Sequence, residues 1–184
     1  MQIIDLRKFI TSTVLTSFAL IVLSSIGIAS DDENKQAPEL PPGCGAIQVQ
    51  AGNKVSFHTY ALGVQIYRWN GTSWDFVAPS AKLFADSGFR GSVGDHYAGP
   101  TWESNSGSKV VARRVDGCSP NTSAIPWLLL QAVTTDGKGI FANTTFIHRV
   151  NTVGGLAPAE PGIFVGVEQK VPYIAEYYFY RAEN

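Results

Sequence analysis

The sequence predicts an all-β fold, either an antiparallel β-sandwich or a closed β-barrel, built as one domain over residues 44–184. Short runs of alternating apolar and polar residues are separated by Gly, Pro or Asn, which is typical of antiparallel sheets. The dipeptide Asn70-Gly71 between two aromatic-rich runs is a strong hairpin signal. No stretch of convincing length has helical periodicity, and no internal repeat is present.

The first 29 residues have the three-part layout of a secretory signal peptide. Arg7 and Lys8 form a basic head, residues 9–28 carry no charge, and the small residue Ala29 precedes the polar run SDDENK. We expect cleavage after Ala29 and a secreted or extracytoplasmic location, in a periplasm or at a cell surface. The alternative is an uncleaved anchor, because residues 9–28 are long enough to cross a bilayer. Once the leader is cleaved, we expect no membrane association.

The segment after this leader, residues 30–43, is polar and proline-rich and is predicted to be a flexible linker. Loss of residues 1–29 removes two cations and one anion, which changes the formal charge from −1 to −2. A chain of this charge has no electrostatic reason to bind nucleic acid. The adjacent basic residues Arg113 and Arg114 would point to opposite faces of a strand.

The two cysteines, Cys44 and Cys118, are predicted to form a disulfide, because an even count in an oxidising compartment favours one. The alternative is a pair of buried free thiols. Neither cysteine has a neighbouring ligand at metal spacing, so we expect no metal site and no cofactor. Three glycosylation sequons indicate surface positions at Asn70, Asn121 and Asn143.

Residues 63–77 form the clearest structural unit, a hairpin. A two-residue loop would pair Trp69 with Thr72, and a four-residue loop would pair Trp69 with Trp74 and Arg68 with Asp75. Both registers differ by an even shift and place four aromatic residues on one face. We expect these four in the core, with an exposed ligand platform as the alternative: Tyr67, Trp69, Trp74 and Phe76.

Further strands are predicted by period-two alternation at 54–62, 109–115, 139–150 and 171–183. In the first of these, Val55, Phe57 and Ala61 are expected on one face. Residues 124–133 are an apolar run that fits either a buried strand or a short buried helix.

Residues 94–104, GDHYAGPTWES, are a turn rich in chemically active side chains. We interpret them mainly as a structural turn set by Gly94, Gly99 and Pro100. The functional alternative is a general base or metal ligand made by His96 with Glu103 or Asp95. No nucleophile motif accompanies them, and the other histidines are far away in sequence.

A second glycine-rich loop is predicted at residues 149–158, RVNTVGGLAP. If the two loops meet, they would form a pocket with Trp102 as its floor and His96, Glu103, Asn151 and Arg149 at its rim. The candidate ligand-binding residues are therefore Trp102, Tyr97, Arg149, Asn151 and Thr152.

Several long blocks resemble a family of exported bacterial and fungal proteins, domain of unknown function 3455. They are AGNKVSFHTYALGVQIYRWNGTSWDFVAP, HYAGPTWESNSGSKVV, AIPWLLLQAV, RVNTVGGLAP and VPYIAEYYFYRA, and together they cover roughly residues 46–182. The resemblance implies no activity, substrate or catalytic residue. Some fungal members bear a malate-dehydrogenase label, but this chain lacks G-x-G-x-x-G after a strand and alternating strands and helices. A dehydrogenase activity is not supported.

The abundance of Tyr and Trp beside few charges favours a ligand-binding module, with a small molecule or a carbohydrate as the ligand. A structural envelope or extracellular protein is the alternative. A hydrolase- or lyase-type enzyme that uses His96 with Glu103 is the second alternative. The sequence carries no signal for a particular oligomeric state.

Overall fold

The structure is a computed structural model that describes residues 36–183. The predicted signal peptide and the first part of the predicted linker lie outside the described residues. Within the described range, no helix is both long enough and apolar enough to cross a membrane.

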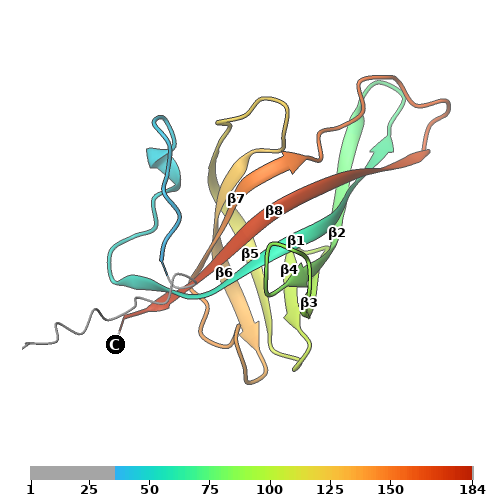
Figure 1. Ribbon diagram of the computed structural model, residues 1–184. Coiled ribbons are helices and arrows are strands. Elements are labelled where there is room, and N and C mark those ends of the chain that lie inside the picture. Colours follow the sequence, from blue (N-terminus) through green and yellow to red (C-terminus); the bar gives the residue numbers. More distant parts are fainter. Residues whose placement is uncertain (1–35, 184) are drawn as a thin grey trace, which may run out of the picture. The chain divides into compact units, whose positions relative to one another are not determined.

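Eight antiparallel strands form one closed barrel, in which each strand pairs with the next and β8 pairs back with β1 (Figure 1). The all-β prediction is confirmed, and of its two forms the barrel is the one observed. A 3-10 turn, η2 (Gly45–Ile47), precedes the barrel. The strands are β1 (Asn53–Trp69), β2 (Trp74–Phe84), β3 (Ser92–Tyr97), β4 (Thr101–Ser104), β5 (Lys109–Cys118), β6 (Trp127–Asp136), β7 (Phe146–Gly154) and β8 (Glu168–Ala182).

The β1–β2 hairpin adopts the four-residue-loop register, in which Trp69 pairs with Trp74 and Tyr67 with Phe76. These aromatic side chains also contact each other across the strands, with ring centroids 5.4 Å and 5.8 Å apart. Only Tyr67 is buried, whereas Phe76 is 54% exposed. Trp69 and Trp74 are half-buried, so of the four residues expected in the core only Tyr67 lies there. The reason is that the ends of β1 and β2 extend past the packed interior, where the start of β8 and the loop 155–167 run beside them (Figure 1).

Inward-facing apolar side chains fill one half of the barrel. Phe141 is fully buried there, and its ring contacts Phe57 and Phe179 at centroid distances of 6.0 Å and 4.5 Å. The predicted strand at 139–150 begins only at Phe146, because the residues before it form a turn. Gly139 has φ 146° in that turn, a conformation that favours glycine. Phe141 thus enters the core from a turn.

A second apolar cluster covers the outside of β5–β8, where the segment before β1 packs on the barrel. Its central members are Ile47 and Val49 from that segment and Phe146 and Tyr180 from the strands. Val55 belongs to this outer cluster and Phe57 to the inner one, although both were expected on one face. A bulge between Val55 and Phe57 breaks the alternation.

The disulfide Cys44–Cys118 ties this outer segment to the end of β5, with Cα atoms 5.4 Å apart. The predicted pairing is confirmed. The three sequon residues Asn70, Asn121 and Asn143 are exposed, as expected.

Two boundaries differ from the sequence prediction. The run 124–133 is a strand from Trp127 onward, which decides between the two alternatives left open for it. The region 149–158 is only partly a loop, because β7 continues to Gly154. An irregularity between Val150 and Val153 places Asn151 at φ 50°, so the strand locally resembles a turn.

Candidate functional site

A cavity of about 530 Å³ occupies the other half of the barrel interior. It lies towards the end of the barrel where β3 is connected to β4 and β5 to β6, because Gly99 of the first connection and Ile125 of the second line it. Eight strands make a barrel wide enough either to be filled by side chains or to hold one small ligand. The exposed side chains of Phe76 and Val77 belong to the lining, so the cavity reaches the protein surface.

Apolar side chains form most of the wall. They come from β2, from the β5–β6 connection and from β6, where alternate residues of the strand point inward. The apolar lining residues from these three segments include Phe76, Val77, Ile125, Pro126, Leu128 and Leu130.

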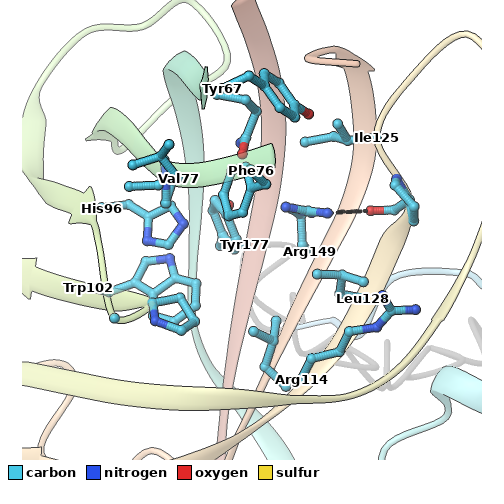
Figure 2. A pocket seen from close by; sticks show the side chains of 17 residues that line it. Tyr67, Phe76, Val77, His96, Trp102, Arg114, Ile125, Leu128, Arg149 and Tyr177 are labelled. Atoms are coloured by element: carbon cyan, nitrogen blue, oxygen red, sulfur yellow. Dashed lines mark hydrogen bonds between the residues drawn. The ribbon is translucent and has the colours of Figure 1, made fainter. Parts of the chain in front are cut away.

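The floor of the cavity is an aromatic group contributed by three strands (Figure 2). His96 of β3 stacks on Trp102 of β4, with ring centroids 4.2 Å apart and planes inclined by 10°. Tyr177 of β8 meets both rings edge-on, at 5.1 Å from His96 and 5.3 Å from Trp102. All three side chains are almost completely buried, so this group is rigid and water is excluded from its far side.

His96 is neutral at physiological pH. Burial lowers the pKa of its imidazole to about 3, and the charge of Arg149 acts in the same direction, although the hydrogen bond to Thr101 opposes both. The Nδ1–H group donates to the Thr101 carbonyl oxygen at 2.9 Å. In this tautomer Nε2 is an acceptor, and no hydrogen bond to it occurs among the described residues.

Two buried donors that belong to cavity-lining residues also lack a partner. They are Gln65 Nε2 and Trp102 Nε1, neither of which has a hydrogen-bond acceptor within residues 36–183. Buried polar atoms of native proteins are almost always paired, so such atoms in a cavity wall need an explanation. Both atoms are fully buried, so a bound molecule would reach them only after these side chains turn towards the cavity.

The opposite wall carries positive charge. Arg149 of β7 is half-buried, and its Nε and Nη2 atoms donate to the Pro126 carbonyl oxygen at 3.1 Å and 2.9 Å (Figure 2). Arg114 of β5 also lines the cavity and is exposed. The lining contains no Asp or Glu.

The structure brings three of the predicted site residues together, namely His96, Trp102 and Arg149. It separates His96 from Glu103. In the β3–β4 hairpin His96 pairs with Trp102, and Asp95 pairs with Glu103. Because adjacent residues of a strand face opposite sides, the first pair points into the barrel and the second points out.

The carboxylates of this hairpin have their own partners on the outer surface. Glu103 accepts a hydrogen bond of 2.5 Å from the Tyr97 hydroxyl and lies 3.3 Å from Lys109. The hydrogen bond from Tyr97, followed by that from Lys109, lowers the Glu103 pKa. Asp95 forms an ion pair with Lys82 at 2.7 Å. No carboxylate therefore orients His96.

The two polar candidates from the second loop also lie outside the cavity lining. Asn151 donates to Glu176 Oε1 at 2.9 Å, and Thr152 donates from Oγ1 to the Ile125 carbonyl oxygen at 2.6 Å. The hydrogen bond from Thr152 nevertheless helps to fix the backbone at Ile125, whose side chain lines the cavity.

Sequence reasoning missed Gln65, Arg114 and Tyr177 as lining residues. The sequence held a signal for two of them. By strand alternation Gln65 shares a face with Tyr67, and Tyr177 shares a face with Tyr173. What was missing was the knowledge of which face points inward. Within residues 36–183, no group of three or more His, Cys, Asp or Glu is placed to hold a metal ion.

Comparison with known proteins gives the family but no function. The profile of the family described as "Protein of unknown function (DUF3455)" matches residues 50–181. Neither the search of curated proteins nor the search of solved structures found a match. The matched segment covers the whole barrel except Ala182, the last residue of β8, and well over half of the chain. The chain therefore belongs to the DUF3455 family.

Proposed function

We propose that the protein is an exported binding module, whose barrel cavity holds one small molecule with a largely apolar body. The observation that supports this proposal best is the cavity itself. Its volume of about 530 Å³ lies within the range typical of small-molecule sites, about 300–1,000 Å³.

The distribution of polar groups in the wall favours an apolar molecule with few polar atoms over a glycan. A glycan presents hydroxyls in all directions, whereas the polar groups of this wall are few and are set among apolar side chains. Nε2 of His96 would accept one hydrogen bond, and the buried donors of Gln65 and Trp102 would give two more once these side chains turn towards the cavity. These atoms would orient a ligand without a large desolvation cost.

The two other functions considered from the sequence have less support. A general base works best with a pKa near the working pH, and burial lowers that of His96 to about 3. A purely structural barrel of this size would fill its interior with side chains along its whole length. Export is part of the proposal, and a disulfide between Cys44 and Cys118 supports it because disulfides persist mainly in oxidising compartments.

The test is a titration with N-phenylnaphthylamine, a neutral apolar dye whose fluorescence rises when it leaves water. The wild-type protein should bind the dye with a stoichiometry of one. Val77→Trp adds bulk at the cavity wall and should weaken binding by about tenfold or more. The control, Val133→Trp, adds the same bulk at a 57% exposed position of β6 that does not line the cavity.

Circular dichroism and thermal unfolding would first establish that both variants fold. Equal affinity of Val77→Trp and Val133→Trp would contradict the proposal, as would a wild-type protein that binds no dye.

A further inference from the structure

We infer that the molecule bound in this cavity is an anion, an apolar compound that carries a carboxylate or a similar acidic group, with Arg149 as its charge partner. This inference rests on the proposed function, because it names the chemical class of the ligand for the same cavity.

The wall of the cavity is positively charged. Two guanidinium groups, those of Arg149 and Arg114, line the cavity without a single carboxylate beside them. Among the described residues neither arginine forms an ion pair, although four pairs between Lys or Arg and a carboxylate are present on the barrel. His96 adds no charge, since it is neutral. The cavity therefore carries two positive charges that the protein itself does not balance.

The geometry of Arg149 favours an anionic partner in the cavity. Two of its three nitrogens donate to one carbonyl oxygen, that of Pro126, which fixes the plane of the guanidinium. The Tyr177 hydroxyl also interacts with this guanidinium, but the five N–H donors of the planar fork meet no carboxylate among residues 36–183. A partly buried charge is stable when it is paired and hydrogen-bonded. An anionic group in the cavity would provide that pairing.

The charge of Arg149 acts on the aromatic residues at the cavity floor. It opposes the rise that burial causes in the pKa of Tyr177 and Tyr173, and it helps to lower the pKa of His96. All these groups are neutral at physiological pH, so none of them can serve as a counter-ion. Their apolar surroundings strengthen the attraction between the guanidinium and an incoming anion.

Arg114 and its neighbour provide a natural comparison. Arg114 lines the cavity and is exposed, whereas Arg113 points to the other face of β5, where it donates to Gln131 Oε1. The two side chains have the same charge and adjacent positions, but only one of them can attract an anion towards the cavity. Because Arg114 is solvated, its effect should be smaller than that of Arg149.

The experiment compares two dyes that share an apolar body and differ in charge. Anilinonaphthalene sulfonate carries one sulfonate, and N-phenylnaphthylamine carries none. The wild-type protein should bind the sulfonate at least tenfold more tightly than the neutral dye. Arg149→Met should weaken sulfonate binding by about tenfold or more, since a hydrogen-bonded charge pair is lost. The same variant should change the affinity for the neutral dye by less than about twofold.

Three further variants sharpen the result. Arg149→Lys keeps the charge and should retain part of the preference for the sulfonate. Arg114→Met should weaken sulfonate binding by about twofold to threefold, and Arg113→Met should leave it unchanged. Dodecanoate should displace the sulfonate dye from the wild-type protein, and dodecanol should do so at higher concentration only.

Four results would overturn the inference. The first is equal affinity of the wild-type protein for both dyes. The second is an Arg149→Met variant that binds the sulfonate as tightly as the wild type, and the third is an equal loss of affinity for both dyes in that variant. The fourth is an equal change in sulfonate affinity in Arg113→Met and Arg114→Met. If the neutral dye still binds in the cavity in these cases, the proposed function stands and only the ligand class is wrong. If neither dye binds, the proposed function fails as well.

Discussion

The imidazole of His96 and the indole of Trp102 stack face to face inside the barrel, with ring centroids 4.2 Å apart. The two residues are cross-strand partners in β3 and β4. The turn between them therefore does not present a catalytic histidine to solvent. It fixes a flat, neutral aromatic floor beneath a cavity.

The first prediction concerns the pH dependence of stability. The unfolded His96 has a pKa of about 6.5, and burial lowers the folded value to about 3. Between these values the unfolded chain binds a proton that the folded protein excludes. The contribution of neutral, buried His96 to stability is therefore fully present above about pH 6.5. Below that, the free energy of unfolding falls by up to about 1.4 kcal/mol per pH unit as the pH decreases towards 3.

Urea unfolding of the wild type and of His96→Gln at a series of pH values from 7 to 4 would measure this. His148, whose pKa burial also lowers, is present in both proteins and contributes equally. The wild type should therefore lose more stability than the variant over that range, because only the wild type contains His96. Parallel pH profiles would contradict the burial of His96.

The second prediction concerns the disulfide, which closes a loop with a sequence separation of 74. Replacement of Cys44 and Cys118 by Ser should lower the free energy of unfolding by about 4 kcal/mol in the chain-entropy model. Hydrogen exchange should also become faster in the segment around Ile47 and Val49, since the disulfide fixes that segment to β5. Unchanged stability and exchange would show that packing alone holds the segment.

The third prediction concerns Phe141, which closes the filled half of the barrel from a turn. Phe141→Ala should cost about 3–5 kcal/mol, because the ring is fully buried against Phe57 and Phe179. Ile140→Ala is the matched control next to it, 40% exposed, and should change stability by less than about 0.5 kcal/mol. Similar effects of both substitutions in chemical denaturation would contradict the assigned core.

The fourth prediction separates the inner and outer faces of the β3–β4 hairpin. Glu103→Gln should leave dye binding unchanged and should not shift the titration of His96 in NMR spectra, because Glu103 bonds Tyr97 and Lys109 outside the barrel. A shift of more than about one pH unit would instead indicate that the two side chains communicate.

Much of the fold follows from local sequence patterns. Asn70-Gly71 and the flanking aromatics predict the β1–β2 hairpin and leave two registers open, of which the structure has the one with the four-residue loop. The opposite orientation of Arg113 and Arg114 follows from strand alternation. Alternation fails where a bulge intervenes. Val55 and Phe57 lie in different clusters for this reason, and a bulge leaves only a weak trace in a single sequence.

The site was partly predictable. Trp102, His96 and Arg149 were expected in one pocket, and all three line the cavity. Glu103 was expected beside them because the hairpin register was not known, and an odd shift moves a side chain to the other face. The empty half of the barrel itself could not be predicted, because it depends on closure of the sheet by β1 and β8, a pairing between the first and the last strand.

The most direct test of the binding cavity is a crystal structure of the wild-type protein with para-iodobenzoate, located by the anomalous scattering of iodine. One iodine site is expected inside the barrel near Trp102 and Leu130, with the carboxylate directed at Arg149. Iodine sites confined to the outer surface, with ordered water in the cavity of the same crystal, would contradict this expectation.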